Sequence, residues 1–400
     1  MSILSDRIHN LAESETLAMT QKSRELAAQG FSVINLSIGE PDFDTPEYIK
    51  EYAKKAIDDN YSHYTPVPGY QDLREAICRK LKRDNNLTFT PDQIVVSNGA
   101  KQSLTNVVLS LINPGDEVIV PTPYWVSYRE IIKLAEGKAV YIPAPIEQDF
   151  KITPQQLEAA ITPKTKLFMF SSPCNPTGSV YTQEELKKLA EVFERHPHVF
   201  ILADEIYELI NFDGGHQSMA QFESIRERVI TVNGVSKGFA MTGWRIGYVA
   251  APKEIAKACN KIQGQITSAP SSIAQRATII AMDQDPKECE DMKAMLEAFR
   301  SRRELLLNLL SEIPGFKCNR PQGAFYLFPD ISYYFGKSYG ETVIQNDSDL
   351  AMWLLNCAHV ALVGGSAFGD PNCIRFSYAT SNENLIEAAK RIKIWLAKLK

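Results

Sequence analysis

Residues 229–247 read Val-Ile-Thr-Val-Asn-Gly-Val-Ser-Lys-Gly-Phe-Ala-Met-Thr-Gly-Trp-Arg-Ile-Gly. The apolar run at the start predicts a buried strand, the small residues after it predict a loop, and a second apolar strand is predicted for 245–251. One lysine, Lys237, lies in that loop between Ser236 and Gly238. Because an apolar strand precedes Lys237 and no carboxylate lies within several residues, we expect burial to lower its pKa and to free a nucleophilic amine.

Two further residues of this stretch suit an anion. Ser236 and Arg245 would bring a hydroxyl and a guanidinium to the same region, a combination that fits a phosphate dianion. A lysine that forms Schiff bases beside a phosphate site indicates pyridoxal phosphate. The alternative is that Lys237 is a surface lysine and Arg245 a structural ion-pair residue, and this stretch alone does not decide between the two.

Composition narrows the class of protein. The chain has 400 residues, 44% of them hydrophobic and 23% charged, which is enough for two or three domains' worth of core. A net charge of −5 argues against a nucleic-acid partner, and no apolar run approaches the ~18 residues of a membrane span. The seven cysteines are scattered without a Cys-x-x-Cys pair, so we expect free thiols and no metal site. The sequence therefore predicts a cytoplasmic protein.

Seven short apolar runs, alternating with helical stretches, begin at Ile94. Most are continuous rather than alternating in polarity, which is typical of a mostly parallel sheet covered on both faces. We therefore predict an α/β fold with a mostly parallel seven-stranded sheet in a large domain, residues 46–290. The expected strands are Ile94–Ser97, Glu117–Val120, Ala139–Ile142, Leu167–Ser171, Val199–Ala203, Val229–Asn233 and Arg245–Ala251.

A smaller α/β domain is predicted from the two ends of the chain, residues 1–45 and 291–400. Its C-terminal part begins with a long helix, 295–310, followed by a strand within 321–328. Its N-terminal part contains a helical segment, 12–27, and a short strand, 32–37, before the proline-rich loop that begins at Gly39.

Polar, glycine-rich or aromatic segments follow the predicted strands. In parallel sheets, ligands bind outside the carboxyl ends of the strands, so these segments should converge. Asp204 ends one buried run, where an unpaired carboxylate would be expensive and a protonated pyridine nitrogen would be a suitable partner. Tyr207 would share a face with Asp204 if a helix starts there. The alternative, favoured by this short motif alone, is that Asp204 caps that helix.

Four other positions carry candidate binding groups. Asn175 is held between two prolines and can donate or accept a hydrogen bond at a ring oxygen. The amides of residues 99–101 precede a helix and would form an anion site. Trp125 can stack on a flat ring or belong to the core. Arg375 is a lone guanidinium in an apolar strand, where it requires a carboxylate from the protein or from a substrate.

Together these motifs resemble a known family. Ser-Pro-x-Asn-Pro-Thr-Gly (172–178), Asp-Glu-x-Tyr (204–207), Ser-Lys-x-Phe-x-Met-x-Gly-Trp-Arg-x-Gly (236–247) and Arg-Phe-Ser-Tyr (375–378) look like class I pyridoxal-phosphate aminotransferases of fold type I. The likeness runs from about Leu11 to the C-terminus. The segments Gly-Glu-Pro-Asp-Phe-Asp-Thr-Pro (39–46) and Pro-Tyr-Trp-Val-Ser-Tyr (123–128) resemble bacterial aspartate aminotransferases of a lysine-using subgroup.

The resemblance implies a role for each candidate residue. Lys237 would form the Schiff base with pyridoxal 5′-phosphate and later carry the proton, Asp204 would pair with the pyridinium, and Trp125 would stack on the ring. The ring hydroxyl would be bound by Asn175 and Tyr207. The phosphate would be held by Ser236, Arg245, the amides of Gly99, Ala100 and Lys101, and Tyr64 from the second subunit of a homodimer.

The same resemblance implies how the substrate is bound. Arg375, Asn175 and the backbone of Gly39 would bind the α-carboxylate. The chain has no arginine between Arg245 and Arg276, where related enzymes carry the one that binds the side-chain carboxylate. That task would fall to three residues in the subgroup that the sequence resembles, namely Lys101, Ser14 and Thr16. The alternative is that Lys101 only balances the phosphate charge.

The expected reaction is amino transfer from aspartate or glutamate to a 2-oxo acid such as 2-oxoglutarate, with some activity on aromatic or prephenate-type substrates. A lyase on the same fold is a rival, because the fold does not fix the reaction. A cofactor-sensing transcription regulator is disfavoured by the acidic charge and by the early start of the likeness. Cys174 and Ala100 depart from the residues usual at their positions, asparagine and glycine, but neither position supplies a required side chain.

Overall fold

The computed structural model describes residues 3–400 and contains the predicted α/β sheet. Seven strands lie in the order β2-β8-β7-β6-β5-β3-β4. Neighbours are parallel except for β8, which is antiparallel to both β2 and β7. The prediction of a mostly parallel seven-stranded sheet is confirmed. The strands are β2 (Ile94–Asn98), β3 (Glu117–Thr122), β4 (Lys138–Pro143), β5 (Thr165–Ser171), β6 (Phe200–Asp204), β7 (Val229–Gly234) and β8 (Ile246–Ala250).

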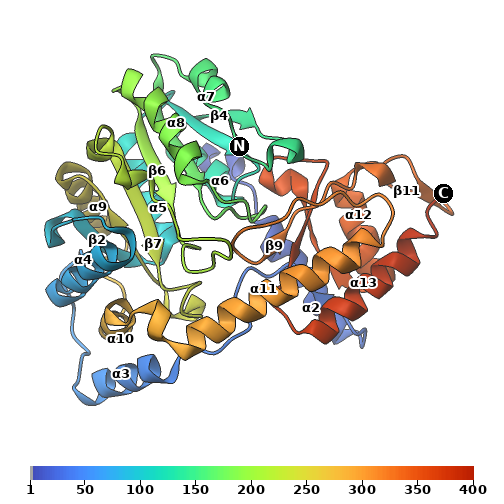
Figure 1. The fold of residues 1–400 in the computed structure, drawn as a ribbon, viewed down its shortest axis with the longest axis horizontal. Helices are drawn as coiled ribbons and strands as arrows, with labels where there is room; N and C mark the ends of the chain where they lie inside the picture. Colours follow the sequence, from blue (N-terminus) through green and yellow to red (C-terminus); the bar gives the residue numbers. More distant parts are fainter. Residues whose placement is uncertain (1–2) are drawn as a thin grey trace.

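Helices cover both faces of this sheet (Figure 1). Successive residues of a strand point to opposite faces, and Phe168 and Met169 of β5 accordingly belong to two different buried clusters. One cluster packs under α3 (Glu47–Asp58), α4 (Gln71–Asn85), α7 (Pro154–Ala160), α8 (Gln183–Arg195) and α10 (Ser272–Asp283), and the other under α5 (Ala100–Leu111), α6 (Ser127–Leu134) and α9 (Lys253–Ile266). Burial on both faces explains why the strands are continuously apolar.

A second group of elements follows the long helix α11 (Glu290–Ser311), which extends away from the seven-stranded sheet (Figure 1). A three-stranded sheet there has the order β13-β14-β9. The predicted strands at 32–37 and 321–328 are shorter than expected, with only two residues each in β1 and β9. The elements are β9 (Tyr326–Leu327), β10 (Ser338–Tyr339), β11 (Thr342–Val343), α12 (Asp347–Trp353), β12 (Val360–Ala361), β13 (Val363–Gly364), β14 (Ile374–Ser377) and α13 (Asn382–Leu396).

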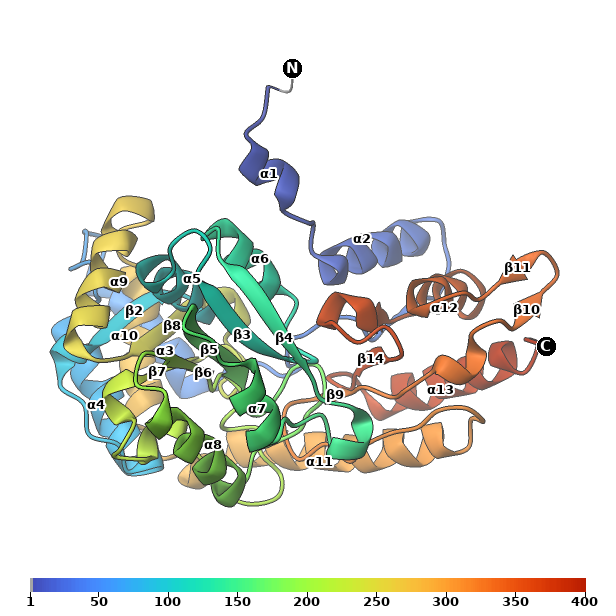
Figure 2. The ribbon, with the colours of Figure 1, turned by 90° about the horizontal axis from the view of Figure 1, so that it is seen from above.

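The N-terminal residues join this second group. β1 (Ile34–Asn35) pairs in parallel with β12, and Met19 of α2 (Glu15–Ala28) is buried in the same cluster as Phe299 and Leu385. Figure 2 shows α2 beside these elements, while α1 (Asp6–Asn10) projects away from the body. The division into domains 46–290 and 1–45 plus 291–400 remains a prediction, and its first two residues lie outside the described part of the chain.

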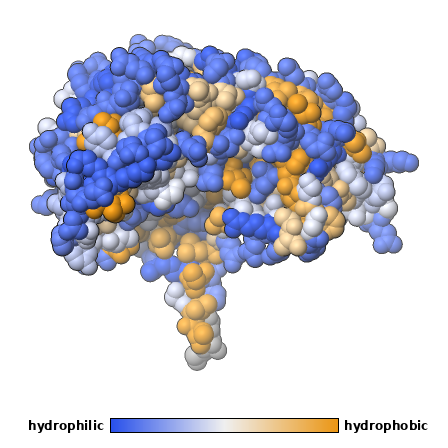
Figure 3. All heavy atoms as spheres, turned by 90° about the horizontal axis from the view of Figure 1, so that it is seen from below, coloured by the Kyte–Doolittle hydropathy of each residue, from blue (hydrophilic) through white to orange (hydrophobic). Residues whose placement is uncertain are grey.

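The surface of the protein is largely polar on the face drawn in Figure 3. A short arm projects from this face. Within residues 3–400, none of the helices combines the length and apolar character that a bilayer crossing requires. All seven cysteines are free thiols, as expected from their spacing.

Candidate active site

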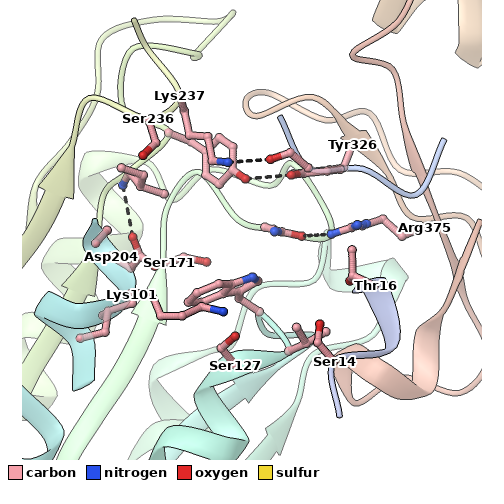
Figure 4. A pocket seen from close by; sticks show the side chains of 18 of the residues that line it. Ser14, Thr16, Lys101, Ser127, Ser171, Asp204, Ser236, Lys237, Tyr326 and Arg375 are labelled. Atoms are coloured by element: carbon pink, nitrogen blue, oxygen red, sulfur yellow. Dashed lines mark hydrogen bonds between the residues drawn. The ribbon is translucent and has the colours of Figure 1, made fainter. Parts of the chain in front are cut away.

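A cavity of about 260 Å³ lies at the carboxyl end of the large sheet, where the second group of elements faces it. Figure 4 shows Lys237 and Asp204 on the side of the large sheet, and Arg375 and Tyr326 on the other side. Thirteen of the fifteen predicted site residues line this cavity. They are Ser14, Thr16, Gly39, Ala100, Lys101, Trp125, Asn175, Asp204, Tyr207, Ser236, Lys237, Arg245 and Arg375.

The Lys237 amine points into the cavity from the loop after β7. Its Nζ donates a hydrogen bond to the carbonyl oxygen of Gly39 at 2.6 Å. A side chain at Gly39 would meet the hydroxyl of Tyr326 at 2.6 Å, so this close approach requires glycine. Burial is the largest influence on Lys237 and lowers its pKa to about 8, which confirms the expectation from the sequence. About a tenth of the amine is therefore neutral at pH 7, far more than for an ordinary lysine.

Asp204 ends β6 and is buried, with 5% of its surface exposed. Its carboxylate accepts a hydrogen bond from the Tyr128 hydroxyl at 2.8 Å and one from the Ile206 amide at 3.3 Å. Burial raises the pKa of Asp204 to about 6, although both hydrogen bonds act in the opposite direction. A cationic partner in the cavity would stabilise the charged form of this buried carboxylate.

The helix expected after Asp204 does not form, so its role as a helix cap is wrong. The amide of Glu205 donates to the carbonyl oxygen of Val232 on β7, which continues the sheet by one residue, and tight turns follow. Tyr207 nevertheless lines the cavity, because these turns direct it there. Its hydroxyl lies 2.8 Å from that of Tyr326.

The start of α5 and the return of the chain through β8 form a cradle for an anion. Gly99, with φ of +81°, is the N-cap of α5, so the amides of Ala100 and Lys101 have no acceptor within their own helix. The guanidinium of Arg245 donates to the carbonyl oxygens of Thr242 and Asn98, and a side chain at Gly99 would collide with it. Amides and guanidinium thus converge where glycine leaves room.

Two observations complete this cradle. Ser236, buried at the start of the Lys237 loop, lines the same cavity. Gly247 of β8 packs directly against the backbone of Gly99 and Ala100, and a Cβ there would overlap that backbone. The antiparallel direction of β8 therefore brings Arg245 beside the helix N-terminus.

Arg375 is 2% exposed and holds its predicted neighbour Asn175. One guanidinium nitrogen donates to the side-chain oxygen of Asn175 at 2.9 Å, and the other donates to the carbonyl oxygen of Ser37 at 2.6 Å. Its Nε is buried without a hydrogen-bond partner among residues 3–400. The rings of Tyr326 and Phe368 flank the guanidinium. Since these partners are neutral, the charge of the Arg375 guanidinium is not compensated by them, and it can bind an anion.

Lys101 and Trp125 lie together at the edge of the cavity. The Lys101 ammonium lies 5.0 Å from the centre of the Trp125 ring, and burial together with Arg245 lowers the pKa of Lys101. Trp125 also packs edge-on against Tyr128. Ser14, at the start of α2, and Thr16 line the same cavity, as Figure 4 shows.

Two predicted site residues are not among those that line this cavity: Gly99, which is the N-cap of α5 directly before Ala100, and Tyr64. The Tyr64 side chain is 99% exposed and lines a separate surface pocket with Ser271 and neighbouring residues. Its expected role from a second subunit remains a prediction. The sequence did not single out Tyr128, Tyr326, Ser127 or Ser171. Tyr128 carried a usable signal, because it lies three residues after Trp125 and a helix there would bring both to one face.

The residues present fit pyridoxal 5′-phosphate. The cavity combines a partly neutral amine on Lys237 with a buried carboxylate on Asp204 that has no cationic partner at hydrogen-bond distance among the described residues. It also holds a cradle of amides around Gly99 and Arg245, and the flat ring of Trp125. An amine, a carboxylate and an anion cradle are the three groups that an aldehyde-bearing pyridine phosphate requires.

Comparisons with known proteins agree with this geometry. The family model for aminotransferase class I and II matches residues 32–392. An aspartate/prephenate aminotransferase of Cereibacter sphaeroides is 49% identical over 402 residues, covering 100% of both chains. The aspartate aminotransferase structure from Rhizobium meliloti has a TM-score of 0.95 at 42% identity and covers 100% of both chains. The Thermus thermophilus aspartate aminotransferase with maleate has a TM-score of 0.90 at 41% identity, covering 99% of this chain and 100% of that one.

These likenesses extend over the whole length of the chain and include the segments that build the cavity. Fold type I is confirmed by solved structures at TM-scores of 0.90 and above. The protein belongs to the class I and II aminotransferases, enzymes that depend on pyridoxal 5′-phosphate.

Proposed function

We propose that this protein transfers the amino group of aspartate or glutamate to a 2-oxo acid such as 2-oxoglutarate, by two half-reactions in one pocket. The observation that carries this proposal is that the Lys237 amine, the Asp204 carboxylate and the Arg375 guanidinium face the same cavity. The similar proteins named above act on aspartate or on aspartate and prephenate by their names, which supports the same substrate class.

Asp204 would hold the cofactor ring by pairing with its protonated nitrogen. Tyr128 supports this role, because its hydroxyl fixes one carboxylate oxygen at 2.8 Å. Asn175 and Tyr207 would hydrogen-bond the ring hydroxyl, and Trp125 would stack on the ring. The phosphate would be held by Ser236, Arg245 and the amides of Gly99, Ala100 and Lys101. When bound, pyridoxal phosphate supplies an electron sink for the bonds at the substrate α-carbon.

Arg375 would bind the α-carboxylate of the substrate, with Asn175 and the backbone of Gly39 beside it. The hydrogen bonds from Arg375 to Asn175 and to Ser37 fix the guanidinium plane before substrate arrives, which lowers the cost of ordering it. Lys101, Ser14 and Thr16 would bind the side-chain carboxylate. Their place at the opposite edge of the cavity from Lys237 supports that assignment (Figure 4).

Lys237 would move the proton. The Nζ atom must be neutral to take the α-proton, and a pKa of about 8 gives it a useful neutral fraction at cellular pH. The hydrogen bond to the Gly39 carbonyl holds the amine over the cavity. Glu40 acts in the opposite direction and keeps the amine basic enough to accept a proton.

We also propose a homodimer with shared active sites, in the cytoplasm. Tyr64, with 99% of its surface exposed, is accessible to a second subunit, which is compatible with its expected role there. The free thiols support a reducing compartment. The predicted domains 46–290 and 1–45 plus 291–400 would then meet across the cavity.

The first experiment adds glutamate to the loaded protein without a 2-oxo acid. Stoichiometric formation of 2-oxoglutarate and of the amine form of the cofactor is expected, and Lys237→Ala should give no turnover. Release of ammonia without the amine form of the cofactor would instead indicate a lyase. Normal kcat in Lys237→Ala would contradict the assignment of the nucleophile.

A second candidate function is amino transfer to aromatic or prephenate-type substrates. It is favoured by the apolar part of the cavity lining, to which Leu17, Leu104 and Trp125 contribute. Comparing kcat/KM for aspartate, glutamate, phenylalanine and prephenate ranks the two functions directly.

A further inference from the structure

The turn that follows β6 presents side chains to two sides. Asp204, Ile206 and Tyr207 line the cavity. Glu205 and Glu208 instead lie in a buried cluster, with only 3% and 4% of their side chains exposed. Two ionisable residues of one short turn are therefore buried away from the ligand.

Each of these carboxylates has a cation of its own. The Lys80 ammonium of α4, with 3% of its side chain exposed, forms a close ion pair with Glu208, whose other oxygen accepts a hydrogen bond from Asn85 at 3.0 Å. His216 Nε2 lies 3.0 Å from a Glu205 oxygen, and the Ser218 hydroxyl donates to the other oxygen at 2.6 Å.

The charges of this cluster balance only when His216 is protonated. Glu205 and Glu208 then carry two negative charges against the positive charges of Lys80 and His216. Burial alone would lower the pKa of His216, but the contact with Glu205 and the nearby Glu208 raise it above its ordinary value. Lys80 holds the pKa of Glu208 below its ordinary value despite burial.

Other groups around the cluster are neutral or separately paired. Asp84 lies 3.8 Å from Lys80 but is bound by Arg83 at 2.6 Å, and the buried phenol of Tyr248 stays neutral because burial and nearby carboxylates raise its pKa. Ligand-type atoms of Glu205, Glu208 and His216 lie within 4.8 Å of one another. The Lys80 ammonium already supplies a cation to Glu208, so the arrangement is an ion network.

This network affects Asp204, which lines the cavity. Glu205 directly follows Asp204 and raises the pKa of that carboxyl, so an unpaired charge on Glu205 would favour the protonated, neutral form of Asp204. His216 offsets that charge. The Lys80–Glu208 pair fixes the other end of the same turn, next to Tyr207.

We propose that Lys80, Glu205, Glu208 and His216 are positioning residues that hold the turn carrying Asp204 and Tyr207, and that the His216 cation keeps Asp204 charged by offsetting Glu205. The proposal rests on the proposed function, in which Asp204 pairs with the protonated ring nitrogen of the cofactor. These four buried ionisable residues would then position the site without touching cofactor or substrate.

The test compares His216→Gln with Glu205→Gln, which remove opposite charges. The measurement is the dissociation constant of pyridoxal 5′-phosphate from the cofactor-free protein as a function of pH, followed by equilibrium dialysis. Affinity should fall as pH drops through the pKa of Asp204. A unit charge acting across roughly 10 Å at an effective dielectric constant of about 20 shifts a pKa by about one unit.

The midpoint of that fall should therefore rise by about one pH unit in His216→Gln and drop by about one unit in Glu205→Gln. The double variant should return to the midpoint of the unaltered protein. His198→Gln, a change at an exposed histidine outside the network, should have no effect. The titration of the cofactor phosphate is common to all variants and cancels in the comparison.

Shifts in the same direction, or weaker binding without a shift of midpoint, would overturn the proposal, since both are expected from loosened packing alone. If His216→Gln does not fold, Glu205→Gln carries the test by itself. Failure of the unaltered protein to bind the cofactor would refute the proposed function instead, so the two failures are distinguishable.

Discussion

Replacing Lys101 by methionine removes the ammonium while keeping most of the side-chain stem that packs against Trp125. In the structure this ammonium lies 5.0 Å from the ring centre of Trp125, in the cavity that Ser14 and Arg375 also line. If Lys101 binds the side-chain carboxylate of the substrate, kcat/KM for aspartate should fall and kcat/KM for phenylalanine should not. Phenylalanine presents an apolar ring to the same place and makes no use of the charge.

The size of the effect follows from the exposure of Lys101. A hydrogen bond to a charged group contributes about 1.5–3 kcal/mol, or roughly a factor of 10 to 100 in kcat/KM. Although the Lys101 ammonium is partly desolvated at the edge of the cavity, the residue as a whole is exposed, and solvent screening weakens exposed ion pairs. We therefore expect the lower end, about a 10-fold loss of kcat/KM for aspartate.

The pH dependence gives a second measurement of the same interaction. Burial and Arg245 lower the pKa of Lys101, and only the charged form binds a carboxylate. The kcat/KM for aspartate should therefore fall on the alkaline side earlier than an ordinary lysine would allow, while that for phenylalanine lacks this limb. Lys187→Met, a change at an exposed lysine on α8, is the matched control. An equal loss for both substrates would refute the reasoning and assign Lys101 to the cofactor phosphate.

Three further predictions concern the rest of the cavity. Capture of pyridoxal 5′-phosphate by the cofactor-free protein needs the neutral amine of Lys237, so its rate should rise with pH and level off above about 8 in stopped-flow measurements; a midpoint near that of free lysine would contradict the lowered pKa. Arg375→Lys loses the two fixed hydrogen bonds to Asn175 and Ser37, and should raise KM for aspartate and phenylalanine alike, by roughly 10- to 100-fold in steady-state assays; a loss confined to aspartate would place Arg375 at the side chain instead. Tyr128→Phe removes a donor to Asp204, whose pKa should rise above about 6, and cofactor affinity should drop about 10-fold by equilibrium dialysis; unchanged affinity would show that the hydroxyl does not support Asp204.

Much of the large sheet could be predicted because its strands are buried on both faces. A residue such as Met169 has an apolar neighbour on either side along the strand, so periodicity and burial carry the same information. The strand ends then predicted which segments meet, including those with Asp204 and Lys237. Strands were also predicted around β1 and β9, but their lengths were overestimated, since how many residues pair there depends on distant partners.

The second layer around the cavity was beyond sequence reasoning for the same reason. Tyr326 reaches Tyr207 from 119 positions away, and nothing local to either residue indicates the contact. The helix expected after Asp204 was wrong because the amide of Glu205 bonds to Val232 on the neighbouring strand, a tertiary contact that overrides the local pattern. Local residue choice indicated the chemistry of the site, and long-range packing determined its geometry.

The pairing of β1 with β12 has a consequence for synthesis. Ile34 lies opposite Val360, so the partner of this apolar segment is made more than 300 residues later. At about 5–20 residues per second, Ile34 and Leu36 leave the ribosome roughly 15–65 s before their strand partner exists. The interval is longer still for Ser37, whose carbonyl oxygen accepts a hydrogen bond from Arg375. The nascent chain must therefore carry an unpaired apolar segment while more than 300 further residues are made, and the substrate side of the cavity can close only after Arg375 has been synthesised.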